Sequence, residues 1–328
     1  MIGAGVLGLC TAAELGARGH TVTVIDPGGT NASSVAAGMI APALESLLED
    51  VDPERAGLLK RARDLWPDFA GSHGLRLHRE GAEWRGQDPA EAVRRLRALG
   101  FTATPTSGGA VTSDDWRVEV GAGLAALRRA PGVSVIRGRA IAVSGEGRRW
   151  RVAAEDGRMW FAAALVLATG AEPAIAGLPP TVAARIDSIT PIRGQVTTVV
   201  GVGLARVVRA DGVYAAPGEN GVVIGATMEP GRRDLTPDPA EAAEQVRSGL
   251  ALMGAAAEAG PTRVGVRGAT ADGLPLAGPA GEPGLHLALA PRRNGWLLGP
   301  LVARVVADGV EGQPPVADAA ALDPLRFP

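Results

Sequence analysis

The sequence is poor in the side chains that build most covalent and metal-dependent sites. Its 328 residues include one cysteine, Cys10, one lysine, Lys60, and four histidines. A single cysteine excludes an internal disulfide and any cage made of cysteines alone, and the histidines lack metal-ligand spacing. The sequence therefore predicts no metal site. Lys60 is the only candidate for Schiff-base chemistry, and it lies in a charged stretch where solvent exposure is expected.

The chain also lacks an excess of one charge and any long apolar run. Its 33 basic and 35 acidic residues give a net charge of −2, which provides no electrostatic reason to bind nucleic acid or an anionic membrane. No stretch of about 20 apolar residues is present, so no membrane span is predicted. We expect a cytoplasmic protein that binds a small molecule.

Glycine and proline, by contrast, are abundant, with 46 and 25 residues. They follow no Gly-x-y period, and 46% of the chain is hydrophobic, which excludes collagen and disorder. The length is typical of about two domains and is sufficient for a sizeable core.

The first 26 residues carry a nucleotide-binding pattern. Gly3, Gly5 and Gly8 form Gly-x-Gly-x-x-Gly, a helical stretch follows over 9–19, and a β-branched strand ends at Asp26. The first glycine permits a tight turn, the second lets backbone approach a pyrophosphate, and the third lets the helix pack on the strand. The helix N-terminus attracts phosphate, and the acid would bind a ribose hydroxyl. Dinucleotide binding is predicted.

Only two residues precede the first glycine of this pattern. The pattern normally follows a strand, and strands average about 5–6 residues. The sequence therefore leads us to expect several further apolar residues before Met1, completing a first strand.

Beyond this unit, helical and strand patterns alternate without an internal repeat. Helices are predicted over 53–70, 90–99, 116–129, 239–258 and 296–308. Strands are predicted over 133–136, 140–143, 149–153, 160–168 and 285–289, and strand patterns dominate 189–225. A fingerprint at one end and a strand–helix pair at the other favour one domain built from separated segments, with a β-rich insertion over 185–263.

Four blocks give the chain a resemblance to a known family. They are residues 3–26; residues 33–42; residues 191–195 with Tyr214 and 225–228; and residues 265–267 with 272–275 and 293–295. The chain resembles the FAD-dependent D-amino-acid oxidase superfamily and is most similar within it to glycine oxidase of thiamine biosynthesis. It departs at Gly268, where the family usually has proline, and at 290–292, where it often has Gly-His-aromatic.

The resemblance implies an α/β fold with two domains. One is a Rossmann-like FAD-binding domain of the glutathione-reductase type, over 1–46, 114–182 and 264–328. The other is a β-rich α+β substrate domain over 47–113 and 183–263.

The resemblance also implies an anion-binding site for an amino acid. Arg267 and Tyr214 would bind the substrate carboxylate, Arg293 would lie near flavin and substrate, and Met228 would line the small pocket. Arginine suits this role because its planar guanidinium binds carboxylate bidentately and stays charged. The ordinary alternatives are a salt-bridged or surface arginine, a core aromatic and plain core packing.

Non-covalent FAD is the implied cofactor, because Cys10 lies inside the first helix and no cysteine lies near the C-terminal turn. The implied cofactor-binding residues are Gly3, Gly5, Val6, Leu7, Gly8, Asp26, Ser33, Ser34, Ala37, Gly38, Met39, Ile141, Gly170, Arg293, Asn294, Gly295, Trp296 and Leu297.

The activity implied is oxidative deamination of glycine or another small amino acid to the imine and 2-oxo acid, with O2 reduced to hydrogen peroxide. Thiazole synthase would accept the imine, and a homo-oligomer is expected. Alternatives are a D-amino-acid dehydrogenase, a sarcosine-oxidase-like enzyme, and a non-catalytic FAD-binding subunit of a heteromeric amine dehydrogenase. A nicotinamide-dependent dehydrogenase would not explain the Gly-Met pair at 38–39 or the Ala-Thr-Gly turn at 168–170.

Overall fold

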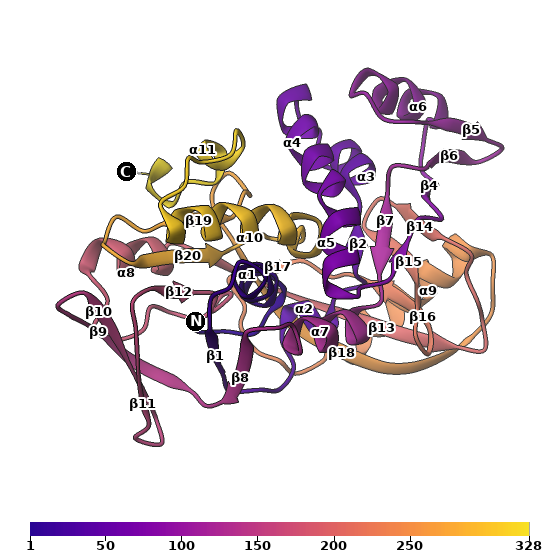
Figure 1. Cartoon of the computed structure of the whole chain (residues 1–328). Coiled ribbons are helices and arrows are strands. Elements are labelled where there is room, and N and C mark those ends of the chain that lie inside the picture. Colours follow the sequence, from indigo (N-terminus) through magenta and orange to yellow (C-terminus); the bar gives the residue numbers. More distant parts are fainter. Residues whose placement is uncertain (328) are drawn as a thin grey trace.

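The computed structural model describes residues 1–327. One of its two parts is a layered α/β unit built from separated segments of the chain (Figure 1). Helix α1 (Val6–Ala17) leads into β1 (Val22–Asp26), which pairs in parallel with β8 (Val133–Arg137). Strand β12 (Leu165–Leu167) pairs in parallel with β20 (Leu285–Leu289), which pairs with β19 (Leu276–Pro279). This confirms the predicted helix–strand unit at the start of the chain and the strand over 285–289.

Ile2 connects these two groups of strands, since it bridges Ile25 on β1 and Leu167 on β12. The Met1 amino group donates to the Thr23 carbonyl at 2.8 Å, and burial lowers the pKa of this amino group to about 6. Beyond Met1, the facing edges of β1 and β12 line a groove that includes Val22 and Val166.

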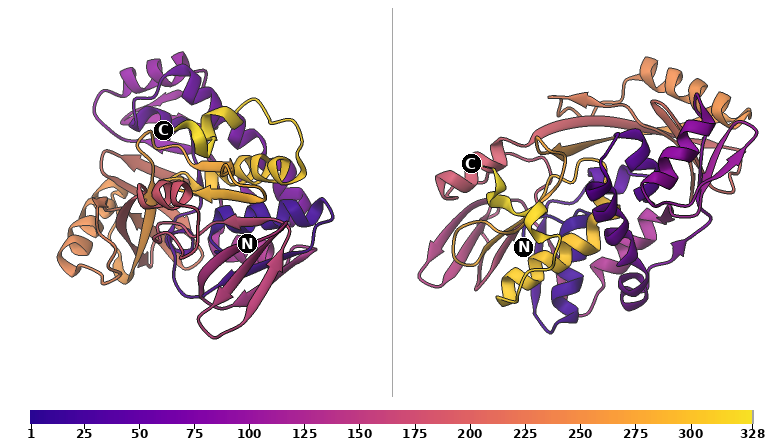
Figure 2. Two further views of the ribbon diagram at one scale, coloured as in Figure 1. Left: turned by 90° about the vertical axis from the view of Figure 1, so that its left-hand side faces the viewer. Right: turned by 90° about the horizontal axis from the view of Figure 1, so that it is seen from above.

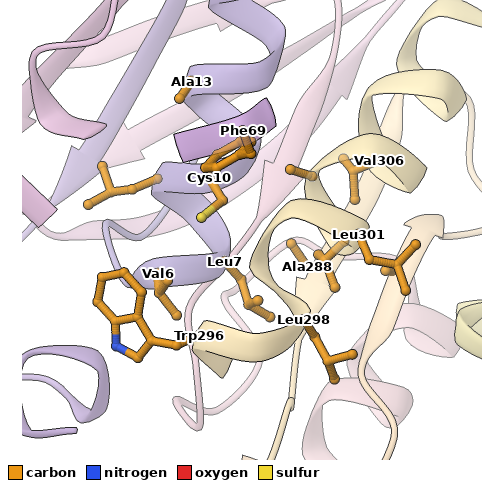
Figure 3. Close-up of a cluster of buried hydrophobic side chains, with 14 of the residues drawn as sticks. Val6, Leu7, Cys10, Ala13, Phe69, Ala288, Trp296, Leu298, Leu301 and Val306 are labelled. Atoms are coloured by element: carbon orange, nitrogen blue, oxygen red, sulfur yellow. The ribbon is translucent and has the colours of Figure 1, made fainter. Parts of the chain in front are cut away.

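Helix α10 (Gly295–Glu311) packs on α1 and forms the centre of the largest core (Figure 3). Val6, Leu7 and Cys10 of α1 belong to the same cluster of buried side chains as Trp296, Leu298 and Leu301 of α10. Cys10 is fully buried, and burial raises the pKa of its thiol. Cys10 is therefore a small apolar core residue.

A nine-stranded mixed sheet makes up the second part. Its strands in spatial order are β17 (Glu229–Pro230), β13 (Thr190–Val200), β16 (Gly221–Gly225), β15 (Val213–Gly218), β14 (Val207–Ala210), β4 (Ala82–Trp84), β6 (Gly109–Thr112) and β5 (Thr104–Thr106), with β18 (Glu258–Ala269) on β13. Helix α9 (Pro239–Met253) covers one side of this sheet (Figure 2). The β13–β18 pairing runs from Thr190 to Val200 on β13 and carries Gly194 and Arg267 of the site described below.

Shorter elements join and cover these two parts. They are α2 (Ala32–Val35), α3 (Pro42–Leu48), α4 (Pro53–Asp64), α5 (Trp66–His73), α6 (Pro89–Ala98), α7 (Val120–Arg128), α8 (Pro180–Asp187), α11 (Ala319–Leu322), the 3₁₀ helix η1 (Pro324–Arg326), a small sheet of β2 (Met39–Ile40), β7 (Trp116–Val118) and β3 (Leu77–His78), and a ribbon of β9 (Ala140–Glu146), β10 (Arg149–Ala154) and β11 (Met159–Ala162). Within residues 1–327, no helix combines the length and apolarity that a membrane crossing needs.

Four predicted elements differ from the observed ones. The strand predicted over 160–168 is two strands, β11 and β12, which belong to different sheets. The predicted helix over 116–129 begins only at Val120, since β7 pairs with both β2 and β3. The predicted helix over 53–70 is two helices, α4 and α5. The helix predicted over 239–258 ends at Met253, where Gly254 adopts a left-handed conformation, and Glu258 already belongs to β18.

Candidate active site

Two cavities meet where the two parts of the protein adjoin. The helix-end cavity is lined by the first turn of α1, by Ala32, Ser33 and Ala36, and by residues 288–293. The arginine cavity is lined by 36–39, by Glu45 and by three arginines, Arg209, Arg267 and Arg293. Ala36, Arg267, Arg293 and Trp296 line both. The two cavities are therefore adjacent parts of one site.

The start of α1 presents unpaired backbone donors to the helix-end cavity. The amide of Val6 donates to Ser33 Oγ at 2.9 Å, whereas those of Gly5, Leu7 and Gly8 have no protein acceptor within residues 1–327. A Cβ on Gly5 would lie 3.2 Å from Ser33 Oγ, so a side chain here would press on the hydroxyl that accepts from the Val6 amide. Free amides at a helix N-terminus bind phosphate oxygens.

Most of the residues expected to bind the cofactor line one of the cavities. Those that do are Gly5, Val6, Leu7, Gly8, Ser33, Ala37, Gly38, Met39, Gly170, Arg293, Asn294, Gly295 and Trp296. The structure places Gly3, Asp26, Ser34, Ile141 and Leu297 outside the linings.

The residues outside the linings have other local environments. The Asp26 carboxylate accepts from the Ala4 and Gly28 amides at 2.7 and 2.8 Å, and Ser34 completes the N-terminal cap of α2. Gly3 needs its positive φ of 104°, and a Cβ there would lie 2.3 Å from the Ala168 carbonyl oxygen. Ile141 is 48% exposed on β9. Gly3 and Asp26 thus shape the loop around the helix end.

Arg267 is the arginine of the site without a carboxylate partner. Its Nη1 donates to the Thr227 carbonyl at 3.2 Å and lies 3.1 Å from Met228 Sδ, and it forms no ion pair with any residue that the structure describes. Burial lowers the pKa of Arg267. A desolvated guanidinium with free donors facing a cavity is suited to bind a carboxylate.

Tyr214 lies beside Arg267, and two glycines without side chains leave room for both of them against the sheet. Burial raises the pKa of Tyr214, against the effect of the Arg267 charge. A Cβ on Gly225 would lie 2.5 Å from the Tyr214 hydroxyl, and one on Gly194 would lie 2.5 Å from Arg267 Nη1. The two side chains therefore pack directly against the backbone of these glycines.

Arg293, in contrast, is already paired. Its Nε is 2.7 Å from Glu45 Oε2 and 2.8 Å from Glu49 Oε1, and its Nη2 is 2.6 Å from Glu49 Oε1. Burial works against the charged form, but the two glutamates outweigh it and raise the pKa of Arg293. Arg293 lines both cavities, and its charge is compensated by Glu45 of α3 and by Glu49, the residue after α3.

The turn before α10 holds a strained backbone at this point. Ala290 and Arg292 adopt φ of 58° and 51°, values that residues other than glycine rarely take. The Arg292 amide donates to the Gly268 carbonyl at 2.8 Å, and a Cβ on Gly268 would lie 2.8 Å from Ile189 Cγ2. The two positions that depart from the family pattern therefore contact each other. Strained residues held by their surroundings concentrate at functional sites.

Residues of this site that were not among the sequence candidates include Glu45, Arg209, Gly194 and Gly225. Glu45 is 5% exposed, and its Oε1 accepts from Arg209 Nη1 at 2.7 Å. The available signal for Gly194 and Gly225 was their place in the 191–195 and 225–228 blocks. No group of His, Cys, Asp or Glu within residues 1–327 is arranged to hold a metal ion.

Asp115 beneath α3 gives a pH-dependent prediction. It accepts from the Ala43 and Leu44 amides at 2.7 and 3.1 Å, and burial nevertheless raises its pKa to about 7 from 3.8. Between pH 4 and 7 the folded protein therefore retains a proton that the unfolded chain has lost, so this group lowers stability as pH rises, by at most about 4 kcal/mol. In urea unfolding, the free energy of unfolding of Asp115→Asn should fall less between pH 4 and 7 than that of the natural protein. Parallel pH profiles would contradict this.

Comparisons with known proteins agree with this geometry. The chain is 28% identical to glycine oxidase of Pseudomonas aeruginosa, over 99% of this chain and 97% of the relative. It is 29% identical to the tRNA 5-methylaminomethyl-2-thiouridine biosynthesis bifunctional protein MnmC of Ralstonia nicotianae, and it spans 60% of that protein's length.

Solved structures show the same fold. Glycine oxidase of Geobacillus kaustophilus has a TM-score of 0.83 at 26% identity, covering 100% of this chain and 98% of the other. Iminodiacetate oxidase of Chelativorans sp. BNC1 also has a TM-score of 0.83, covering 98% of each chain, and its 23% identity supports the fold alone.

The sequence profile of the DAO family, described as FAD dependent oxidoreductase, matches residues 1–309. The match includes both the open helix end of α1 and the arginine cavity. The unpaired amides and the glycine backbone at α1 fit the diphosphate of FAD, and the predicted cofactor and α/β fold are confirmed. The chain therefore belongs to the DAO family of FAD-dependent oxidoreductases.

Proposed function

We propose that the protein oxidises glycine or another small amino acid at its C–N bond. The substrate loses two electrons and two protons to give the imine, which water hydrolyses to the 2-oxo acid and ammonia. O2 takes up the two electrons and two protons and becomes hydrogen peroxide. The observation that carries this proposal is the unpaired guanidinium of Arg267 in a cavity next to the helix end of α1.

Bound FAD supplies the two-electron acceptor for the hydrogen on the substrate α-carbon. Arg267 binds the substrate carboxylate through its free donors, and the Tyr214 hydroxyl donates to the same group. Met228, with Sδ 3.1 Å from Arg267 Nη1, borders this position and limits the side chain that fits. Arg293 borders both cavities, held by Glu45 and Glu49. The residues at the start of α1 and at Ser33, Gly170 and 293–296 would hold the cofactor.

The imine would supply a thiazole synthase in thiamine biosynthesis, in line with the glycine-oxidase resemblance. One methylene changes binding by only about 1–3 kcal/mol, so sarcosine and D-alanine are alternatives to glycine. A D-amino-acid dehydrogenase differs in its electron acceptor. A non-catalytic FAD-binding subunit would have no use for the pair of Arg267 and Tyr214.

A substrate panel tests the proposal and separates these alternatives. Purified, flavin-loaded protein is mixed with glycine, sarcosine and D-alanine, first without oxygen and then with it. An oxidase bleaches the flavin without oxygen and forms peroxide with it, whereas a dehydrogenase bleaches it but forms little peroxide. No bleaching by any amino acid would refute the proposal.

We also expect the FAD cofactor to be bound non-covalently. Cys10 lies on α1, is buried in the core and lines neither cavity, so it offers no thiol for a flavin link. Acid precipitation of the loaded protein should release the yellow flavin to the supernatant. Flavin that stays with the denatured pellet would show a covalent bond.

A further inference from the structure

Arg193 on β13 is fully buried, and the proposed function leaves it without a role. Its Nη1 donates to Glu229 Oε1, its Nε to the Asp234 carbonyl at 3.2 Å, and its Nη2 to the Thr236 carbonyl. These acceptors stand in a stretch of the chain whose residues 230–237 are all exposed. Hydrogen bonds from a charged donor are stronger than those between neutral groups. Arg193 therefore holds this exposed stretch against β13.

Two residues at the start of this stretch connect Arg193 to Arg267. Glu229 Oε1, which accepts from Arg193, also accepts from Thr227 Oγ1 at 3.3 Å. The Thr227 carbonyl in turn accepts from Arg267 Nη1 at 3.2 Å, and no other protein oxygen within residues 1–327 accepts from this guanidinium. Arg193, Glu229 and Thr227 thus form a support network whose last hydrogen bond is made with the arginine that faces the cavity.

Arg193 lies on the face of the sheet opposite to Arg267. Neighbouring residues of a strand point to opposite faces, so the side chain of Arg193 and the side-chain position of Gly194 do so too. A Cβ on Gly194 would lie 2.5 Å from Arg267 Nη1, which places Arg267 on the Gly194 face. Glu229 pairs with Arg193 from the neighbouring strand β17, and Arg193 lines neither cavity. Any effect of Arg193 on a ligand of the arginine cavity must therefore pass through other residues.

We propose that Arg193, Glu229 and Thr227 are positioning residues for Arg267, which hold its guanidinium in the orientation that receives a carboxylate. This inference rests on the proposed function, because it needs Arg267 as the carboxylate site. Immobilising a long side chain when a ligand binds lowers the affinity, and a side chain that is already held in place avoids this loss. The support network provides Arg267 with a fixed acceptor before the ligand arrives.

The test uses Thr227→Val, which removes the hydroxyl that binds Glu229 and the Gln195 amide but leaves the ion pair of Arg193 with Glu229 in place. Thr227 lines neither cavity, so the variant changes no direct contact with a ligand. On the FAD-loaded protein, the dissociation constant of acetate should rise about three- to tenfold, as calorimetry or the flavin absorbance would report.

The kinetic constants of Thr227→Val separate positioning from a general structural role. KM for the best amino-acid substrate should rise by a similar factor, whereas kcat should stay within about twofold. The reason is that a bound carboxylate returns Arg267 to its place, so the loss is one of uniform binding. A merely structural defect would reduce the amount of active, FAD-loaded protein and would leave KM and the acetate dissociation constant unchanged.

Two control variants accompany Thr227→Val. Thr227→Ser retains the hydroxyl and should bind acetate as the natural protein does. Thr197→Val removes another buried hydroxyl of β13, which lies 2.9 Å from Thr262 Oγ1 and lines neither cavity, and it should leave acetate affinity and KM unchanged. If Thr227→Val fails to fold, Arg193→Lys takes its place, because lysine retains the buried charge without the planar fork that reaches several acceptors. It should weaken acetate binding to a similar extent.

Each outcome has a distinct meaning. Acetate affinity and KM of Thr227→Val equal to those of the natural protein, or an equal loss in Thr227→Ser or Thr197→Val, overturn the positioning role. Acetate binding that Arg267→Ala leaves unchanged overturns the carboxylate site, and with it the proposed function and this inference. Acetate binding that depends on Arg267 but not on the Thr227 hydroxyl refutes the inference alone.

Discussion

Arg267→Ala should reduce kcat/KM for the best amino-acid substrate by about 30- to 5,000-fold. The variant leaves a buried substrate carboxylate without its charged partner, which costs roughly 2–5 kcal/mol, and each 1.36 kcal/mol corresponds to a factor of ten. Steady-state kinetics with peroxide detection gives the ratio. FAD content should be unchanged, because the amides of α1 are intact.

Arg263→Ala is the matched control for this experiment. Arg263 lies on the same strand, β18, but is exposed, donates to the Ser34 carbonyl at 3.3 Å and lines neither cavity. Its activity should stay within about twofold of the natural protein, as is usual for surface positions. Normal turnover by Arg267→Ala, or an equal loss in both variants, would show that the carboxylate site is assigned to the wrong residue.

Gly194→Ala should have the second-largest effect, although it touches no substrate. The new methyl group would lie 2.5 Å from Arg267 Nη1, 2.8 Å from Arg267 Nη2 and 2.6 Å from the Thr227 carbonyl oxygen, all inside contact distance. The guanidinium must move, and a displacement of about 1 Å at a reacting site can cost about 100-fold in rate. We expect a loss of this size in kcat/KM, measured in the same assay.

Gly145→Ala on β9 separates this effect from a general cost of replacing a strand glycine. No atom lies within 4 Å of a Cβ at Gly145, so this variant should retain full activity. Gly194→Ala should still fold and bind FAD, as circular dichroism and the flavin absorbance would report. Unchanged kinetics in Gly194→Ala would mean that Arg267 does not depend on the bare backbone of β13.

The local elements of the FAD-binding part could be predicted because neighbouring residues determine them. The glycine pattern at α1, the β-branched β1 and the apolar β20 each carry their signal within a few residues. Trp116–Val118 shows the opposite case: the helix pattern that follows led the predicted helix to begin at 116, and pairing with β2 and β3 makes these three residues a strand.

The candidate site was predictable in part for the same reason. Its arginines stand in recognisable blocks, but the charge state of the cavity depends on pairs such as Glu45 with Arg209 and Glu49 with Arg293, which lie 164 and 244 residues apart. Gly194 matters only because Arg267 on the neighbouring strand lies across it. No local pattern contains this information.

The contact between α1 and α10 has a consequence for protein synthesis. The two helices stand at opposite ends of the chain, and the last wall of both cavities comes with Trp296. At translation rates of about 5–20 residues per second, α1 leaves the ribosome roughly 15–60 s before its partner. During that interval the face of α1 that packs on α10 lacks its partner, and the FAD site lacks one side. The complete FAD site can therefore form only after α10 has been synthesised.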